Sequence, residues 1–285
     1  MNTTDEPFPW REYGDDELDT EYATLVRRVR EKIEFPLSFS VVGFKCTDVF
    51  FQYERMLTPG VGRPSTVEYW RRSKDKVKDF SKRLSQDLFR TVNYFNHAPS
   101  HFPLMTAAKL YLYFGASVVF DPYAGWGDRC LAAMSVGVDY IGVEKNPNLE
   151  EPFKKLKARY PSTSNVRVLT GPCEEVDFDG IDFDFVLTSP PFWKRGKMIE
   201  RYNDNEVSYS DFMESFIPVM ERCVMKAACV CIYMPRGMYE DTASTLGPCD
   251  VELTARFNNR SVEVIYCWNI DKGPSSLEDG PYSTL

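Results

Sequence analysis

The feature that most constrains this chain is a regular alternation of apolar runs and amphipathic segments that begins near residue 100. The apolar runs predict buried strands, and the segments between them have apolar residues at helical spacing. Five such runs lie at 117–123, 138–146, 166–171, 183–191 and 228–235. Strands that alternate with helices form a mostly parallel sheet, so we predict an α/β fold. Two further runs, 250–257 and 262–270, predict an antiparallel hairpin at the end of the sheet.

The composition is that of an ordinary soluble protein, with 43% hydrophobic and 27% charged residues among 285. No apolar run approaches the roughly 18 residues that a membrane-spanning helix needs, so we expect no membrane segment. The first 25 residues are acidic and lack an apolar core, which argues against a secretory signal. We therefore expect an intracellular protein, in the cytoplasm or the nucleus.

The eight cysteines form no C-x-x-C pair, and the closest two are Cys229 and Cys231 inside an apolar run. We interpret them as reduced residues of the core, which is typical of intracellular proteins. The chain has only two histidines, His97 and His101. A His-rich metal site and a Ser-His-Asp hydrolase are therefore both disfavoured, and we expect no metal.

Charge is distributed unevenly along the chain. The net charge is -8, which argues against a protein coated with nucleic acid. Residues 71–90 nevertheless carry eight Lys or Arg against three Asp. Such a basic stripe is either a contact surface for nucleic acid or a solvated helix face.

The first 95 residues do not follow the strand–helix rhythm. Residues 38–54 are predicted to be extended and partly buried. Ser65 and Glu68 form the pattern of a capping box, which predicts a helix from there to about Tyr94. We expect residues 1–95 to be a helical N-terminal appendage, in the role of a nucleic-acid clamp.

A glycine turn follows the first predicted strand in "VVFDPYAGWGDR". Gly125 and Gly127 let the backbone approach a ligand closely, and the following helix offers free N–H groups beside it. Glu144 ends the second strand, where a carboxylate can accept both hydroxyls of an adenosine ribose. The third glycine of a dinucleotide-binding turn is missing, and Asp128 would repel a pyrophosphate. An acidic residue suits a ligand that carries an ammonium and a sulfonium group, so S-adenosylmethionine is favoured over NAD.

With these residues the chain resembles the class I S-adenosylmethionine-dependent methyltransferases. "DPYAGWGDR" is similar to their first motif and "GVEKN" to their second, over about residues 98–270. The resemblance implies a Rossmann-like fold with a seven-stranded sheet, and a methyltransferase domain at 96–285. It also implies these cofactor-binding residues: Asp121, Tyr123, Ala124, Gly125 and Gly127 at the first motif, Glu144 and Lys145 at the second, and Cys173 and Glu174 beside the adenine.

The segment "NHAPSHFPLMTAAKLYLYF" resembles the tenth motif of the same family, which comes first in this circular order. By that resemblance His101, Phe102 and Pro103 contact the methionine end of the cofactor. For His101 the alternative is a capped helix that packs on the sheet.

Ser189-Pro190-Pro191-Phe192 follows the fourth predicted strand, at the edge of the sheet where ligands bind. The exocyclic amine of a nucleobase is a poor nucleophile, because its lone pair is delocalised into the ring. The Ser189 hydroxyl and the Pro190 carbonyl can accept the amine protons and so help to localise that pair. The prolines fix the backbone, and Phe192 offers a face on which an extruded base can stack. Such a tetrapeptide also occurs in plain turns.

The tetrapeptide resembles the fourth motif of nucleic-acid amino-methyltransferases, which implies that Ser189 to Phe192 are the catalytic set and that Ser189 also contacts the cofactor. The serine in the first position is most similar to the enzymes that methylate cytosine N4, and methylation of adenine N6 is left as an alternative. The residues that follow are predicted to bind the substrate through backbone phosphates, the alternative being a solvated loop. They are Trp193, Lys194, Arg195, Lys197 and Arg201.

The leading hypothesis is methyl transfer from S-adenosylmethionine to a nucleobase amine in nucleic acid, with DNA slightly favoured over RNA. Because no large target-recognition domain is evident, we expect either readout of a short sequence or help from a partner subunit or a homodimer. The alternatives are methylation of a protein glutamine amide or a small molecule, and a non-catalytic binding protein with the cofactor fold.

Overall fold

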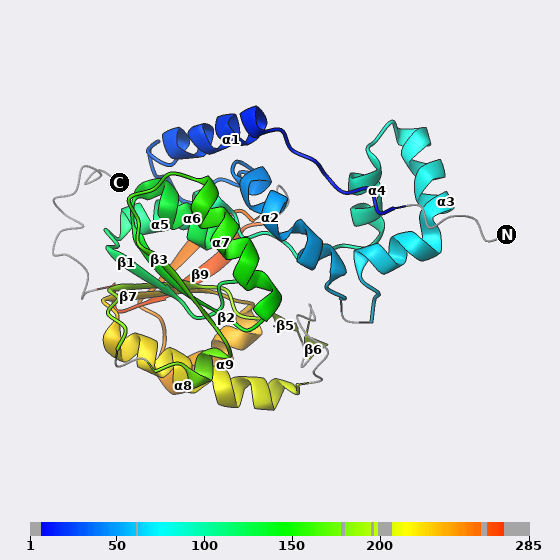
Figure 1. The fold of residues 1–285 in the computed structure, drawn as a ribbon. Helices are drawn as coiled ribbons and strands as arrows, with labels where there is room; N and C mark the ends of the chain where they lie inside the picture. The colour runs from blue at the N-terminus through cyan, green and yellow to red at the C-terminus, as the bar shows by residue number, and fades with distance from the viewer. Residues whose placement is uncertain are drawn as a thin grey trace.

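The computed structural model describes residues 7–60, 62–177, 180–194, 197–198, 207–257 and 261–270, with only the backbone of Lys194, Lys197 and Met198. Its centre is a sheet of seven strands (Figure 1). The strands are β1 (Val118–Asp121), β2 (Asp139–Glu144), β3 (Val166–Thr170), β4 (Phe185–Thr188), β7 (Cys229–Tyr233), β8 (Val251–Ala255) and β9 (Glu263–Trp268).

The strands lie in the order β3-β2-β1-β4-β7-β9-β8. The first five are parallel, and β9 runs antiparallel to both of its neighbours. The chain leaves the middle of the sheet in both directions from β1, as in a doubly wound nucleotide-binding fold. The predicted Rossmann-like fold, with its mostly parallel seven-stranded sheet and terminal antiparallel hairpin, is thus confirmed.

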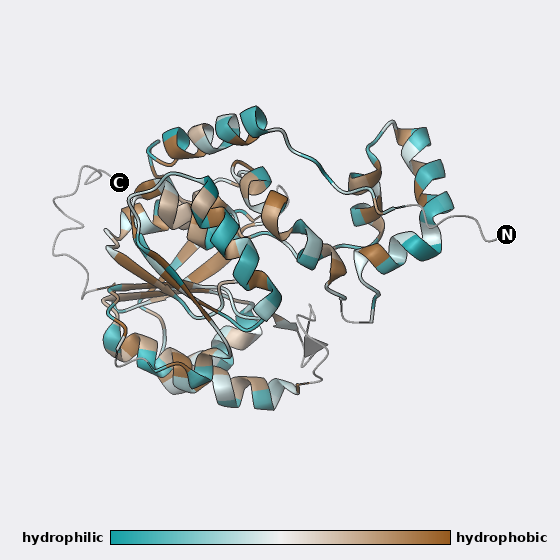
Figure 2. Ribbon diagram, viewed as in Figure 1, coloured by the Kyte–Doolittle hydropathy of each residue, from teal (hydrophilic) through white to brown (hydrophobic). Residues whose placement is uncertain are grey.

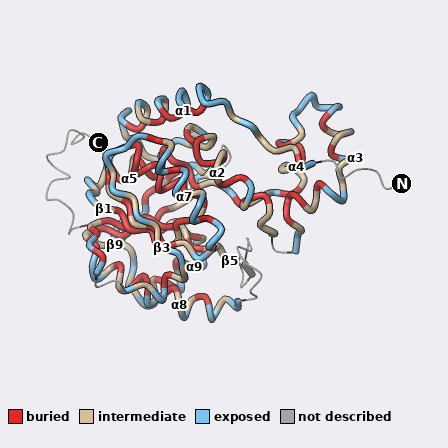
Figure 3. Tube along the Cα trace, viewed as in Figure 1, coloured by how far each residue is buried: buried red, intermediate tan, exposed pale blue. Residues whose placement is uncertain are grey.

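Successive strand residues pack into two separate cores, because side chains alternate between the faces of a sheet. Cys229 and Cys231 face one core, and Val230 and Ile232 face the other. Figures 2 and 3 show the result, an apolar and buried sheet between helices whose outer faces are polar and exposed. All eight cysteines are free, as predicted, and only Cys249 is less than fully buried.

Helices cover both faces of the sheet (Figure 1). On one face lie α5 (Leu104–Tyr113), α6 (Asp128–Val136) and α7 (Glu150–Arg159), and on the other lie α8 (Tyr209–Lys226) and α9 (Arg236–Leu246). Short elements complete the body: η1 (Pro147–Leu149), η2 (Cys173–Glu175), and the β5 (Trp193–Lys194) and β6 (Lys197–Met198) pair. Within the described parts of the chain, no helix combines the length and apolar character of a membrane span.

The first two helices, α1 (Asp15–Arg28) and α2 (Phe44–Leu57), belong to the main core. Leu25, Cys46 and Phe51 pack in the same cluster as α5, α6 and α7. The prediction that residues 38–54 are extended is wrong from Phe44 onward. The buried positions of α2 include 48, 51, 52, 55 and 56, a helical spacing, but three of these residues are polar and hide the pattern.

An arm formed by α3 (Thr66–Leu84) and α4 (Leu88–Phe95) projects from the body (Figure 1). Ser65 accepts a hydrogen bond from the Glu68 N–H at 3.1 Å, which confirms the predicted start of the helix. The single predicted helix is divided after α3, because Ser85 takes a left-handed conformation (φ 50°) and Asp87 caps a new helix. A kink at Ser73 (φ -133°, ψ 15°) further divides α3 itself. The arm has a small core of its own, which includes Phe8, Met56, Val67, Trp70, Val77, Phe89 and Val92.

Candidate active site

A cavity of about 650 Å³ lies at the carboxyl edge of the parallel strands. This edge, at the point where the strand order reverses between β1 and β4, is where open α/β sheets bind ligands. The cavity brings together residues that the sequence placed in four separate motifs. The predicted site residues on its wall are His101, Phe102, Tyr123, Ala124, Gly125, Glu144, Lys145, Cys173, Glu174, Ser189, Pro190, Pro191 and Phe192.

Asp121 lies beneath the wall rather than on it. It is fully buried and accepts hydrogen bonds from Arg129 Nε at 2.6 Å, Tyr140 Oη at 2.7 Å and Thr188 Oγ1 at 2.9 Å. These three donors come from α6, β2 and β4. The carboxylate therefore holds together the elements that carry the glycine turn, Glu144 and Ser189.

Gly127 also lies off the wall, and its role is one of packing. It begins α6 with φ 76°, and a Cβ atom built there would lie 2.6 Å from the Phe51 ring. Gly125, with φ 61°, does line the cavity. Of the two predicted glycines, therefore, only Gly125 lies on the cavity wall. Pro103 starts α5 and is likewise not part of the wall.

Glu144 ends β2, and both of its carboxylate oxygens accept backbone hydrogen bonds. Gly125 N–H donates to Oε2 at 2.9 Å and Asn146 N–H donates to Oε1 at 2.8 Å. Burial raises the pKa of Glu144 to about 7, and these two hydrogen bonds oppose the rise. The orientation of the carboxylate at the cavity is thus set by the backbone on either side of it.

The wall beyond Glu144 is mostly apolar. Val143, Pro172 and Cys173 line the cavity there, and Cys173 is buried. Burial raises the pKa of the Cys173 thiol to about 12, so it is neutral near pH 7. A flat, neutral ring system fits such surroundings.

Four aromatic rings form a cluster beside the Ser-Pro-Pro-Phe segment. Phe192 meets Tyr233 edge-on at 4.9 Å, and Tyr233 stacks on Phe257 at 3.8 Å. Phe102 meets Phe257 edge-on at 5.1 Å. All four line the cavity. A planar acceptor group can pack against such a cluster, which lies on the same cavity wall as Ser189.

The sequence reasoning missed two members of this cluster. Tyr233 could have been found, because it ends β7 and the ends of parallel strands meet at one edge. Phe257 follows β8 in the predicted hairpin, but the sequence gives no sign that this end of the hairpin lies at the cavity. Asp128, which the sequence placed beside the ligand, is also on the wall. The other wall residues that were not predicted are Ser100, Pro122, Trp126, Arg129, Val143, Gly171, Pro172, Val207, Asp211, Phe212 and Ser215.

Trp193 is packed into the protein and is not on the cavity wall. Its ring is 5% exposed and lies 5.4 Å from Tyr209 and 5.9 Å from Phe212. Of the other predicted substrate-binding residues, Arg195 and Arg201 lie outside the described residues, as do the side chains of Lys194 and Lys197. Their proposed contacts stay a prediction.

Comparison with known proteins yields likenesses of fold. No protein-family model and no curated protein matches the chain. Among solved structures, a human methyltransferase 10 domain containing protein is 13% identical, with 60% of this chain and 85% of that chain covered and a TM-score of 0.43. The hMettl16 catalytic domain in complex with MAT2A 3'UTR hairpin 1 is 13% identical (60% and 71% covered, TM-score 0.46). An RNA methyltransferase from Salinibacter ruber in complex with S-adenosyl-L-homocysteine is 15% identical (64% and 97% covered, TM-score 0.39).

Proposed function

We propose that this protein transfers a methyl group from S-adenosylmethionine to the exocyclic amine of a nucleobase in nucleic acid. One observation carries the proposal. Ser189 to Phe192, at the end of β4, share the wall of a single cavity with Glu144 and the Gly125 turn. The segment proposed to hold the acceptor amine and the residues proposed to hold the cofactor therefore share one cavity, as positioning of the amine beside the cofactor requires.

The residues of the cavity fit the proposed cofactor. Glu144 presents a carboxylate for two ribose hydroxyls, and the Val143–Cys173 side is apolar and neutral, as an adenine ring requires. His101 and Phe102 belong to the segment that resembles the tenth motif, where the methionine end of the cofactor would be held. When bound, the cofactor would supply the methyl group on a positively charged sulfur. The cavity volume is within the range of about 300–1,000 Å³ for small-molecule sites.

On the acceptor side, the residues of this chain orient a weak nucleophile rather than supply a strong base. The Ser189 hydroxyl and the Pro190 carbonyl accept the amine protons, while Phe192 and Tyr233 hold the ring plane. The amine loses one proton as it gains the methyl group, and these two oxygens, which already accept hydrogen bonds from the amine, are the first acceptors for that proton as it leaves. We expect Ser189→Ala to reduce turnover by about 10²-fold while cofactor affinity changes little. Equal losses in both would contradict the assigned role.

The arm supports nucleic acid as the substrate. Residues 65–95 carry eight Lys or Arg against four Asp or Glu, on a chain whose net charge is -8. Tyr94 is 63% exposed and stacks on Phe80 at 5.9 Å, and the Lys76 ammonium lies 5.0 Å from the Phe95 ring centre. Cations beside exposed aromatic rings suit single-stranded nucleic acid. We therefore keep residues 1–95 as the proposed clamp and 96–285 as the methyltransferase domain, with the arm as the contact surface.

The test is transfer of labelled methyl groups to DNA and RNA pools, followed by mass spectrometry of the nucleosides. We expect a label on cytosine N4 or adenine N6, with DNA slightly favoured. Label only on ring carbons or ribose oxygens would refute the amine mechanism.

The acidic net charge favours one alternative, methylation of a glutamine amide in a protein. Salt distinguishes the two substrates. Binding of nucleic acid weakens steeply as salt rises, because phosphate contacts release counterions, whereas binding of a protein depends on salt far less. Failure to bind the cofactor by calorimetry would instead favour a non-catalytic role.

A further inference from the structure

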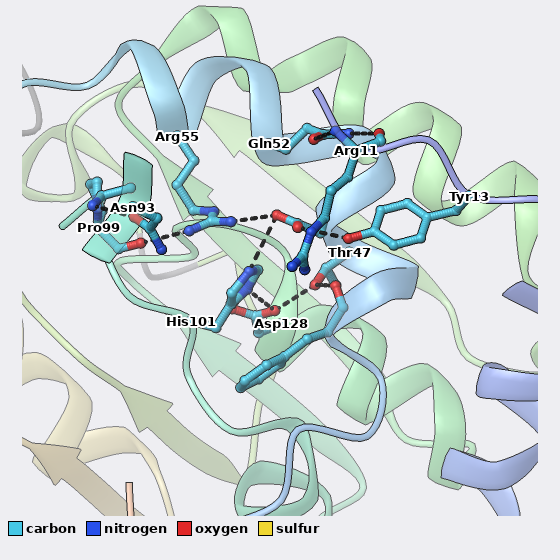
Figure 4. A network of polar contacts seen from close by, with 12 residues as sticks. Arg11, Tyr13, Thr47, Gln52, Arg55, Asn93, Pro99, His101 and Asp128 are labelled. Atoms are coloured by element: carbon cyan, nitrogen blue, oxygen red, sulfur yellow. Dashed lines mark hydrogen bonds and ion pairs between the residues drawn. The ribbon is translucent and has the colours of Figure 1, made fainter. Parts of the chain in front are cut away.

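A cluster of buried charges lies behind one end of the cavity (Figure 4). Its members are Asp48 and Arg55 on α2, His101 before α5, and Asp128 at the start of α6. Asp48 and Arg55 are 4% exposed and Asp128 is 2% exposed. Buried charges are costly unless they are paired, so this arrangement calls for an explanation beyond the packing of a helix.

His101 is held between two carboxylates. Its Nδ1 atom lies 3.0 Å from Asp128 Oδ1, and its Nε2 atom lies 3.4 Å from Asp48 Oδ1. Only the imidazolium form can donate from both nitrogens. With Arg55 beside Asp48 at 2.5 Å, two positive and two negative charges balance.

The pKa directions agree with this geometry. Burial lowers the pKa of His101, but Asp128 and Asp48 outweigh that effect and raise it above the usual value, although Arg55 opposes them. Burial also raises the pKa of Asp48, but His101 and Arg55 outweigh it and hold that pKa well below its usual range.

Two hydroxyls also donate to the carboxylates, Tyr13 Oη to Asp48 Oδ2 at 3.0 Å and Thr47 Oγ1 to Asp128 Oδ1 at 2.7 Å. Further contacts fix the backbone around the histidine. Arg55 Nη1 donates to the Pro99 carbonyl at 3.0 Å, and the Phe102 N–H donates to Asp128 Oδ2 at 3.0 Å. The His101 ring also stacks on Phe44, the first residue of α2, at 4.6 Å. The wall segment 100–102 is therefore bound to α2 on one side and to α6 on the other.

From these contacts we infer that α2 completes the cofactor site, with Asp48 and Arg55 as positioning residues that act through His101. Neither residue lines the cavity, whereas His101 and Asp128 do. Asp48 fixes the charge and ring plane of His101, and Arg55 fixes both Asp48 and the backbone at Pro99. The inference rests on the proposed cofactor and extends the site to a helix that precedes the alternating strands and helices in the sequence.

The test compares Asp48→Asn with Gln52→Ala by calorimetry with S-adenosylmethionine, after thermal melts establish that both variants fold. Gln52 is a matched control, because it lies one turn further along α2 and, among the described residues, its side chain hydrogen-bonds the Arg11 backbone alone, at 2.8 and 3.2 Å. We expect Asp48→Asn to weaken cofactor binding about 10-fold, through a displaced wall. Gln52→Ala should lower the melting temperature without changing that affinity.

Nuclear magnetic resonance of the histidine rings gives a readout that loss of packing alone would not move. The chain has only two histidines, and His97 is exposed and serves as a reference. We expect both ring nitrogens of His101 to be protonated at pH 7 in the wild-type protein. In Asp48→Asn the ring should become neutral, with the cofactor KM raised and kcat nearly unchanged.

Three outcomes of these measurements test the role of Asp48 and Arg55. A folded Asp48→Asn variant that binds the cofactor within twofold of wild type overturns the inference. If that variant does not fold, Arg55→Lys is measured in its place. This variant keeps the charge but cannot bridge Asp48 and the Pro99 carbonyl as a guanidinium does, so unchanged cofactor affinity in it also overturns the inference. Failure of the wild-type protein to bind the cofactor removes the proposed function instead.

Discussion

At the scale of single residues, Glu144 links the chemistry of the site to pH. Its pKa is raised from 4.5 to about 7 by burial, so its folded-state pKa lies above that of the unfolded chain. Such a carboxyl group stabilises the fold most at low pH, and this contribution is lost as pH rises through about 7. The form that can accept two ribose hydroxyls is the ionised one, which dominates only above that pH.

We therefore expect cofactor affinity to rise between pH 6 and pH 8, while the free energy of unfolding of the cofactor-free protein falls by about 2 kcal/mol from pH 5 to pH 8. The control is Glu144→Gln, which cannot ionise and should lose the rise in affinity and most of the fall in unfolding free energy; His101, whose pKa is also raised, contributes the rest of that fall. Calorimetry measures the affinity, and urea denaturation at each pH measures the unfolding. A Gln variant with the same pH dependence as wild type would assign the effect to another group.

At the scale of elements, α2 is packed against the glycine turn so closely that Gly127 has no room for a side chain. A Cβ atom there would lie 2.6 Å from Phe51 Cε2, and φ is 76°. We expect Gly127→Ala to lower the free energy of unfolding by about 3 kcal/mol, from overpacking and backbone strain together.

Gly62→Ala separates the two causes. Gly62 has φ 68°, and, its own chain neighbours aside, no atom of the described residues lies within 4 Å of the position that a Cβ atom would take there, so strain alone applies. The expected loss is then about 1 kcal/mol. Equal losses in the two variants, measured by urea denaturation, would show that the contact with Phe51 is unimportant.

The same helix shows the limit of what could be predicted from the sequence. The sheet could be predicted because β4 and β7 are continuous apolar runs, and most of the cavity wall followed from residues at the ends of strands. The helix α2 could not be, because Asp48, Gln52 and Arg55 occupy buried positions that normally carry apolar residues. Their burial depends on partners such as His101 that are distant in the sequence. Sequence spacing alone cannot reveal a polar network of this kind.

At the scale of the whole molecule, charge is separated between the arm and the rest of the chain. Because the acidic body repels a polyanion, the proposed nucleic-acid substrate would approach the basic arm first and pass from there to the edge of the sheet. Figure 1 shows the arm projecting on the same side of the body as β5 and β6, which follow directly from the Ser-Pro-Pro-Phe segment.

This arrangement gives a prediction for Lys76 and Tyr94. We expect the double variant Lys76→Glu/Tyr94→Ala to bind a single-stranded oligonucleotide about 10-fold more weakly than wild type, with a shallower dependence on salt. Fluorescence anisotropy over a series of salt concentrations measures both quantities. Lys154→Glu is the matched control, because it makes the same charge change on an exposed residue of α7, where Lys154 pairs with Glu150 at 2.7 Å. If the control weakens binding as much as the arm variant does, the effect comes from overall charge and the arm is not the contact surface. Cofactor affinity should be unchanged in both, since neither alters the cavity wall.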